Sequence, residues 1–71
     1  MISYAPLWET MKAKGVTTYT LRYKQNAYGE NIGGGTFSRI QAGESISTNT
    51  LNILCKILEC RVEDIIEYIP D

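Results

Sequence analysis

Two cysteines and three nearby carboxylates are the side chains of this sequence that come closest to a catalytic group. They are Cys55, Cys60, Glu63, Asp64 and Glu67, and the chain contains no histidine, the residue that most often transfers protons in enzymes. The cysteines fall on an apolar stripe, where a thiol acts as a small hydrophobic group. The carboxylates flank an expected helix start, where negative charge complements the helix macrodipole. The residue types therefore predict no catalytic site, no enzyme and no small-molecule substrate.

The same two cysteines offer little to a metal ion or a disulfide. Two thiols without a histidine cannot complete the four-ligand shell of a zinc site. Five positions separate Cys55 from Cys60 on one expected helix and its end. Along a helix this spacing places the Cα atoms beyond the roughly 7 Å limit for a disulfide. We expect no metal, two free thiols that pack as apolar side chains, and a reducing, cytoplasmic setting.

A glycine-rich run at 29–36 is the pattern most able to cradle the phosphates of a cofactor. A Walker loop ends in Gly-Lys followed by Ser or Thr, but glycine precedes Thr36 here. The dinucleotide-binding spacing of glycines after a strand is also not matched. The run is more typical of a turn, because each glycine in a helix interior costs about 1 kcal/mol relative to alanine. We therefore expect no cofactor.

Charge is distributed unevenly, although the net charge of the chain is only −1. Residues 1–42 contain five basic and two acidic side chains, a net charge of +3, whereas residues 43–71 contain two basic and six acidic ones, a net charge of −4. A basic half is typical of a surface that meets a polyanion such as double-stranded DNA. Chance segregation of charge on solvated surfaces is the alternative.

Length and composition predict one small globular domain over residues 1–71. Of the 71 residues, 44% are hydrophobic and 21% are charged, the profile of an ordinary globular chain. No apolar run approaches the roughly 20 residues that span a bilayer. The first residues lack the basic start and long apolar core of a signal peptide. We expect no membrane partner.

Helix start and stop signals predict four or five helices. They are expected at 6–14, from 17 to 25 or 26, from 35 or 36 to 42, from 47 to about 60, and at 64–69. Thr17 and Ser47 are the predicted N-caps, and Gly43 is the predicted stop of the third helix. For the two ends of the chain the alternative is a short strand at 2–4 that pairs with 68–69.

The segment from Thr17 to Gly43 has the features of a helix-turn-helix, in which the second helix enters the major groove. Its apolar residues form an inner face that would fix the helix crossing, and its polar residues flank them. The apolar residues are Leu21, Ile32, Phe37 and Ile40, and the polar ones are Thr36, Ser38, Arg39 and Gln41. These polar side chains are of the types that read base edges.

The third expected helix and the turn before it resemble a known family. Residues 32–43 read Ile-Gly-Gly-Gly-Thr-Phe-Ser-Arg-Ile-Gln-Ala-Gly, similar to the signature I-S-x-x-T-[IL]-S-R-[IL]-x-x-G of the phage Cro and repressor-type (XRE-like) helix-turn-helix family. The opening at 2–8 and the end at 50–71 resemble a compact bacterial and phage subgroup. The resemblance implies an all-α, compact five-helix bundle of the lambda-repressor-like DNA-binding type. It also implies a cytoplasmic transcriptional regulator that binds an operator.

The resemblance implies DNA contacts in two places. Thr17 and Thr18 match the helix start at which the family contacts phosphates, where free N–H groups attract anions. The matched groove-facing positions are Gly34, Gly35, Ser38 and Arg39, to which the residue pattern adds Thr36 and Gln41. Because one short helix makes few base contacts, we expect a homodimer on two half-sites.

Two departures from the family pattern support a second hypothesis. Eleven positions separate Leu21 from Ile32, so the turn of the helix-turn-helix is enlarged by an insertion. Two groove positions hold glycine, which has no side chain to read a base edge. Either Arg39 carries most of the direct readout, or the inserted Tyr28 and Asn31 contact the DNA instead. The alternative is a protein-interaction module on a helix-turn-helix scaffold with weak or lost operator recognition.

Overall fold

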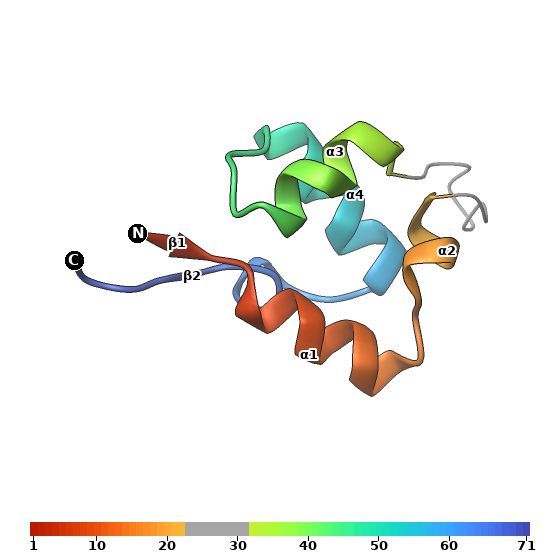
Figure 1. The fold of residues 1–71 in the computed structure, drawn as a ribbon. Coiled ribbons are helices and arrows are strands. Elements are labelled where there is room, and N and C mark those ends of the chain that lie inside the picture. The colour runs from red at the N-terminus through yellow and green to blue at the C-terminus, as the bar shows by residue number, and fades with distance from the viewer. Residues whose placement is uncertain (23–31) are drawn as a thin grey trace.

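The computed structural model describes residues 1–22 and 32–71, which form four α-helices, a short 3-10 helix and two short strands. In chain order these elements are β1 (Ile2–Ser3), α1 (Ala5–Lys14), α2 (Thr18–Arg22), α3 (Gly34–Gln41), α4 (Thr48–Leu58), η1 (Val62–Asp64) and β2 (Glu67–Tyr68). Figure 1 shows α1 and α3 on opposite sides of α4, with both chain ends at the side away from α2. The third helix begins one position earlier than predicted.

Buried apolar side chains from all four α-helices meet in one core. The core residues are Tyr4, Leu7, Met11, Leu21, Ile32, Phe37, Ile40, Leu54, Leu58 and Ile65. Among the described residues, no polar or charged side chain is buried. The ring of Trp8 on α1 packs edge-on against the ring of Phe37 on α3, with centroids 5.9 Å apart and an interplanar angle of 74°, a favourable aromatic geometry. The predicted inward pair of the third helix, Phe37 and Ile40, is confirmed.

The end of α3 is set by a glycine, as predicted. Gly43 has a φ of +77°, in the left-handed region that residues with a Cβ atom disfavour. Its N–H donates to the Ile40 carbonyl at 3.1 Å, and the Glu44 N–H donates to the Arg39 carbonyl at 2.8 Å. These two bonds form a Schellman motif, which satisfies carbonyls that the helix leaves open. The chain then turns into the loop that leads to α4.

Ser47 caps the start of α4, as predicted. Its Oγ accepts a hydrogen bond from the Thr50 N–H at 3.1 Å, and its backbone is extended. On either side of the cap, Ile46 and Leu51 are partly buried against the core. This is the arrangement of a hydrophobic staple, in which the residues before and after the cap fix the direction of entry.

Replacing Ser47 with alanine is expected to lower the free energy of unfolding by about 1 kcal/mol, because the first turn of α4 then loses its side-chain acceptor. Urea denaturation followed by far-UV circular dichroism measures the change. Ser45→Ala is the matched control, since Ser45 is an exposed serine in the preceding loop. Equal losses in the two variants would contradict the assignment of the cap.

The C-terminal segment differs from the helix predicted at 64–69. After η1 the chain extends into β2, which pairs antiparallel with β1 so that Ile2 lies opposite Tyr68. Pairing satisfies backbone groups of both terminal segments, while Ile65 is still fully buried in the core. The predicted all-α, five-helix bundle is therefore wrong in part. The alternative of paired strands at the two ends is confirmed.

Cys60 does not continue α4, and this changes the geometry of the cysteine pair. Glu59 follows the end of the helix with a φ of +50°, and the Cys60 N–H donates to the Cys55 carbonyl at 3.2 Å. The two thiols lie near enough for each to shift the pKa of the other. Both cysteines carry free thiols and are only partly buried. The predicted wide separation is wrong because it assumed a helix that reaches residue 60.

Candidate nucleic-acid interface

The two helices of the predicted helix-turn-helix are joined at their inner ends. Leu21 in α2 and Ile32 just before α3 are both buried, and the Ile32 N–H donates to the Leu21 carbonyl at 2.7 Å. Leu21 and Ile32, which lie on either side of residues 23–31, are therefore held together on the core. The predicted end of the second helix near 25 or 26, and the inserted Tyr28 and Asn31, lie outside the described residues.

The outer face of α3 consists of small and polar residues. Of the predicted groove-facing residues, Gly35, Ser38, Arg39 and Gln41 are exposed, and Gly34 and Thr36 are half-buried. Arg39 carries the one charge within α3. Because Phe37 and Ile40 are buried, the helix is fixed with this face pointing away from the core. In Figure 1, α3 lies at the edge of the molecule, on the side of α4 away from α1.

The start of α2 exposes a second group of polar residues. Thr17 is the N-cap, as predicted, since its Oγ1 accepts from the Thr20 N–H at 3.3 Å. Thr17 and Thr18 are both exposed, and the neighbouring Tyr19 has 65% of its surface exposed. The N–H groups of a first helical turn lack intrahelical acceptors. Hydroxyls and N–H groups at this position can therefore donate to an anion.

Positive charge precedes the start of α2 along the chain. Lys12 and Lys14 are exposed in the last turn of α1, a few residues before Thr17. Neither α2 nor α3 contains an acidic residue. Most acids of the C-terminal half instead lie in η1, β2 and their flanks. Lys12 was not among the predicted site residues. Its position could have been read from the sequence, because Gly15 marks the end of α1 and Lys12 falls in the last turn before it.

Comparison with known proteins decides the family. Residues 6–71 match the model of the Cro/C1-type helix-turn-helix DNA-binding domain. The chain belongs to this family. The Cro/C1-type domain is also similar to the crystal structure of the transcriptional regulator VanUg (Form II), with a TM-score of 0.80 and 30% sequence identity over 99% of this chain and 87% of that chain. No curated protein matches the sequence significantly.

The family match confirms the predicted resemblance and identifies the chain as a DNA-binding helix-turn-helix domain. It supports double-stranded DNA as the partner. It also agrees with the fold, because α2 and α3 occupy the two positions of the helix-turn-helix that the sequence predicted. Within the described residues, no helix is long and apolar enough to cross a membrane, and no three potential metal-ligating side chains lie together.

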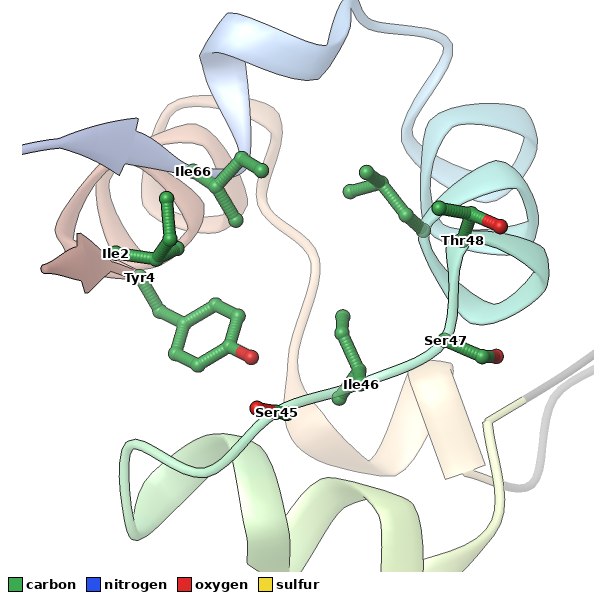
Figure 2. Close-up of a pocket in the computed structure, with 8 residues that line it drawn as sticks. Ile2, Tyr4, Ser45, Ile46, Ser47, Thr48 and Ile66 are labelled. Carbon is green, nitrogen blue, oxygen red and sulfur yellow. The ribbon is translucent and has the colours of Figure 1, made fainter.

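An apolar cavity of about 200 Å³ lies on another part of the Cro/C1-type domain. Its walls come from β1, the α3–α4 loop, the start of α4 and the segment before β2, as Figure 2 shows. Figure 2 places Ile2 and Ile66 on one side of the cavity and Thr48 on the other. The Tyr4 hydroxyl donates to the Glu44 carbonyl beside it, and burial raises the pKa of this phenol. No local motif predicts this cavity, because its lining residues are distant in sequence.

Proposed function

We propose that this Cro/C1-type domain is a sequence-specific transcriptional regulator and that α3 is its recognition helix. The observation that carries the proposal is the division of α3 into a buried apolar side and an exposed polar side with one arginine. A helix of this kind can enter the major groove only if its outer face is uncovered. Residues 1–71 act as one helix-turn-helix domain in the cytoplasm, where its DNA partner is found.

The proposed DNA contacts are of two kinds: phosphate contacts that orient the domain and base contacts that recognise the sequence. At the start of α2, Thr17 and Thr18 bind phosphates, which fixes the orientation of the domain but carries no sequence information. The long side chain of Arg39 reads a guanine, the most common specific contact of arginine. The remaining contacts of α3 are made by Gly34, Gly35, Thr36, Ser38 and Gln41. The two glycines allow the helix backbone to approach the DNA closely.

We also propose that two copies act together as a homodimer. One eight-residue helix contacts few bases, and two helices on half-sites one turn of DNA apart are the usual remedy. Large apolar side chains stay exposed around β1 and β2. They are Met1 (60%), Ile2 (50%), Tyr68 (68%) and Ile69 (39%). Exposed apolar patches mark interaction surfaces, which supports the two-stranded sheet as the dimer contact.

Selection from a pool of random duplexes tests this function. We expect enrichment of an inverted repeat whose half-sites are about 10 base pairs apart, as a two-fold dimer requires. Fluorescence anisotropy on the selected duplex then measures the dissociation constant at increasing salt. Affinity is expected to fall at least about tenfold between roughly 50 and 200 mM salt, because phosphate contacts release counterions.

Other outcomes of the same experiment separate the alternatives. Enrichment of a single asymmetric site would contradict the homodimer and leave the recognition helix in place. No binding to any duplex at about 50 mM salt would instead favour the protein-interaction module, since non-specific binding is strongest at low salt. The two glycines on the groove-facing side and the net charge of −1 are the features that favour this second function.

A further inference from the structure

We propose that Cys55 and Cys60 form a reversible intramolecular disulfide, which makes the end of α4 a site of thiol oxidation. The proposal is independent of DNA binding. It starts from the turn after α4, where the left-handed Glu59 reverses the chain direction. In a continuous helix these two positions would be too far apart to bond.

The geometry of the turn brings the two cysteines together. The Cys60 N–H donates to the Cys55 carbonyl at 3.2 Å, so the two backbones are in direct contact. The two thiols also lie near each other, because each one shifts the pKa of the other. A disulfide requires close Cα atoms and side chains that point toward each other. The backbone hydrogen bond meets the first requirement. Rotation of the two cysteine side chains can meet the second while Leu54 and Leu58, the buried residues of α4, stay in place.

Neither cysteine is fully buried, which leaves the pair within reach of a small oxidant. Both cysteines are partly buried but not enclosed in the core. Low-molecular-weight disulfides such as glutathione disulfide are therefore suitable reactants. The charged groups around the pair are Glu63 and Asp64 of η1 and Lys14 of α1.

The reaction proceeds by two thiol–disulfide exchanges. The Cys60 thiol loses its proton, and the thiolate attacks one sulfur of glutathione disulfide. The sulfur–sulfur bond of that reagent breaks, a mixed disulfide forms, and the departing glutathione thiolate takes up the proton. Deprotonated Cys55 then attacks the Cys60 sulfur, which releases the second glutathione. Two protein thiols are oxidised, and one glutathione disulfide is reduced to two thiols.

The electrostatic surroundings set the pH at which this exchange is fast. Burial raises the pKa of the Cys55 thiol, the neighbouring Cys60 thiol lowers it, and the negative charges of Asp64 and Glu63 raise it. The net shift is upward. Burial, then Cys55 and Asp64, raise the pKa of the Cys60 thiol, while the positive charge of Lys14 opposes them. Both thiols are therefore protonated at neutral pH. Because the thiolate is the nucleophile, oxidation is expected to accelerate about tenfold per pH unit between roughly pH 7 and 8.

The test compares the folded and the denatured chain in the same glutathione redox buffers. After acid quenching, intact mass spectrometry measures the fraction of chain that is lighter by two hydrogen atoms. The ratio of disulfide to dithiol is multiplied by the squared concentration of reduced glutathione and divided by the concentration of glutathione disulfide. The result is the effective concentration of one protein thiol at the other. If the fold holds the two thiols close together, the effective concentration in the folded chain is expected to be at least about tenfold higher than in the chain denatured with guanidinium chloride. By linkage, the disulfide form is also expected to melt at a higher temperature than the dithiol form.

Single variants supply the controls. Cys55→Ser and Cys60→Ser are each expected to stop at a glutathione adduct, with no loss of two hydrogen atoms. An effective concentration in the folded wild-type chain that is equal to or below the denatured value would overturn the proposal. Persistent glutathione adducts or cross-linked dimers as the main products of the folded chain would also overturn it. The comparison uses the wild-type protein, so it holds even if a variant folds poorly.

Discussion

Replacing Phe37 with alanine is expected to lower the free energy of unfolding by about 3–5 kcal/mol. Phe37 is only 4% exposed and packs edge-on against Trp8. Its loss removes apolar burial and leaves a cavity between α3 and α1. Because small domains have total stabilities of only about 5–15 kcal/mol, this variant is expected to lose much of its stability. Urea denaturation followed by circular dichroism and by the fluorescence of Trp8 measures the effect.

Ser38→Ala is the matched control for Phe37→Ala. Ser38 is the next residue on α3, and its side chain is exposed. A surface substitution of this kind usually changes stability by less than about 0.5 kcal/mol. If both variants unfolded like the wild-type protein, Phe37 would not hold α3 on the core. The inner face on which the recognition-helix proposal depends would then be assigned incorrectly.

Helices were predictable from this sequence where their signals are local. Ser47 is followed by Thr50, whose N–H it caps, and Gly43 follows α3 at the position that needs a left-handed residue. Such signals act within a few residues, so they can be read without knowing the rest of the fold. The glycine run before Phe37 delays α3 less than expected. Burial of Phe37 and Ile40 outweighs the weak helix propensity of these glycines.

The C-terminal segment was predicted poorly because its structure depends on distant residues. Its two-residue strand exists only through pairing with β1 at the other end of the chain. The apolar spacing of Ile65, Ile66 and Ile69 fits a helix as well as it fits this extended segment, in which Ile65 alone is fully buried. Likewise, the approach of Cys60 to Cys55 follows from a left-handed glutamate, a conformation that few such residues adopt.

The candidate site was predictable in its outline. Once Phe37 and Ile40 were assigned to the inner face, helical geometry predicted that Ser38 and Arg39 face outward, and both are exposed. Gln41 lies four positions after Phe37, beside the inner face, and is exposed at the end of the helix. The hydrogen bond between the Ile32 N–H and the Leu21 carbonyl was not predictable. It joins residues eleven positions apart in sequence, and no local signal specifies such a contact. The DNA contacts of these side chains remain predictions.

Arg39→Ala is expected to weaken binding to the selected duplex by about 5–150-fold, which corresponds to the roughly 1–3 kcal/mol of a bidentate arginine–guanine pair. The side chain is exposed, so the fold and the melting temperature are expected to stay unchanged. If Arg39 reads a base, binding to an unrelated duplex is expected to change little. If it contacts only phosphate, binding to all duplexes would weaken uniformly.

Arg61→Ala removes the same charge at a different place and is the matched control. The side chain of Arg61 is 82% exposed and lies 3.6 Å from a Glu63 carboxylate oxygen, at the start of η1. The decisive measurement is the dissociation constant of the wild-type, Arg39→Ala and Arg61→Ala proteins on one selected duplex at one salt concentration. Recognition through the outer face of α3 predicts a large loss for Arg39→Ala and wild-type affinity for Arg61→Ala. Wild-type affinity in Arg39→Ala, or equal losses in the two variants, would contradict it.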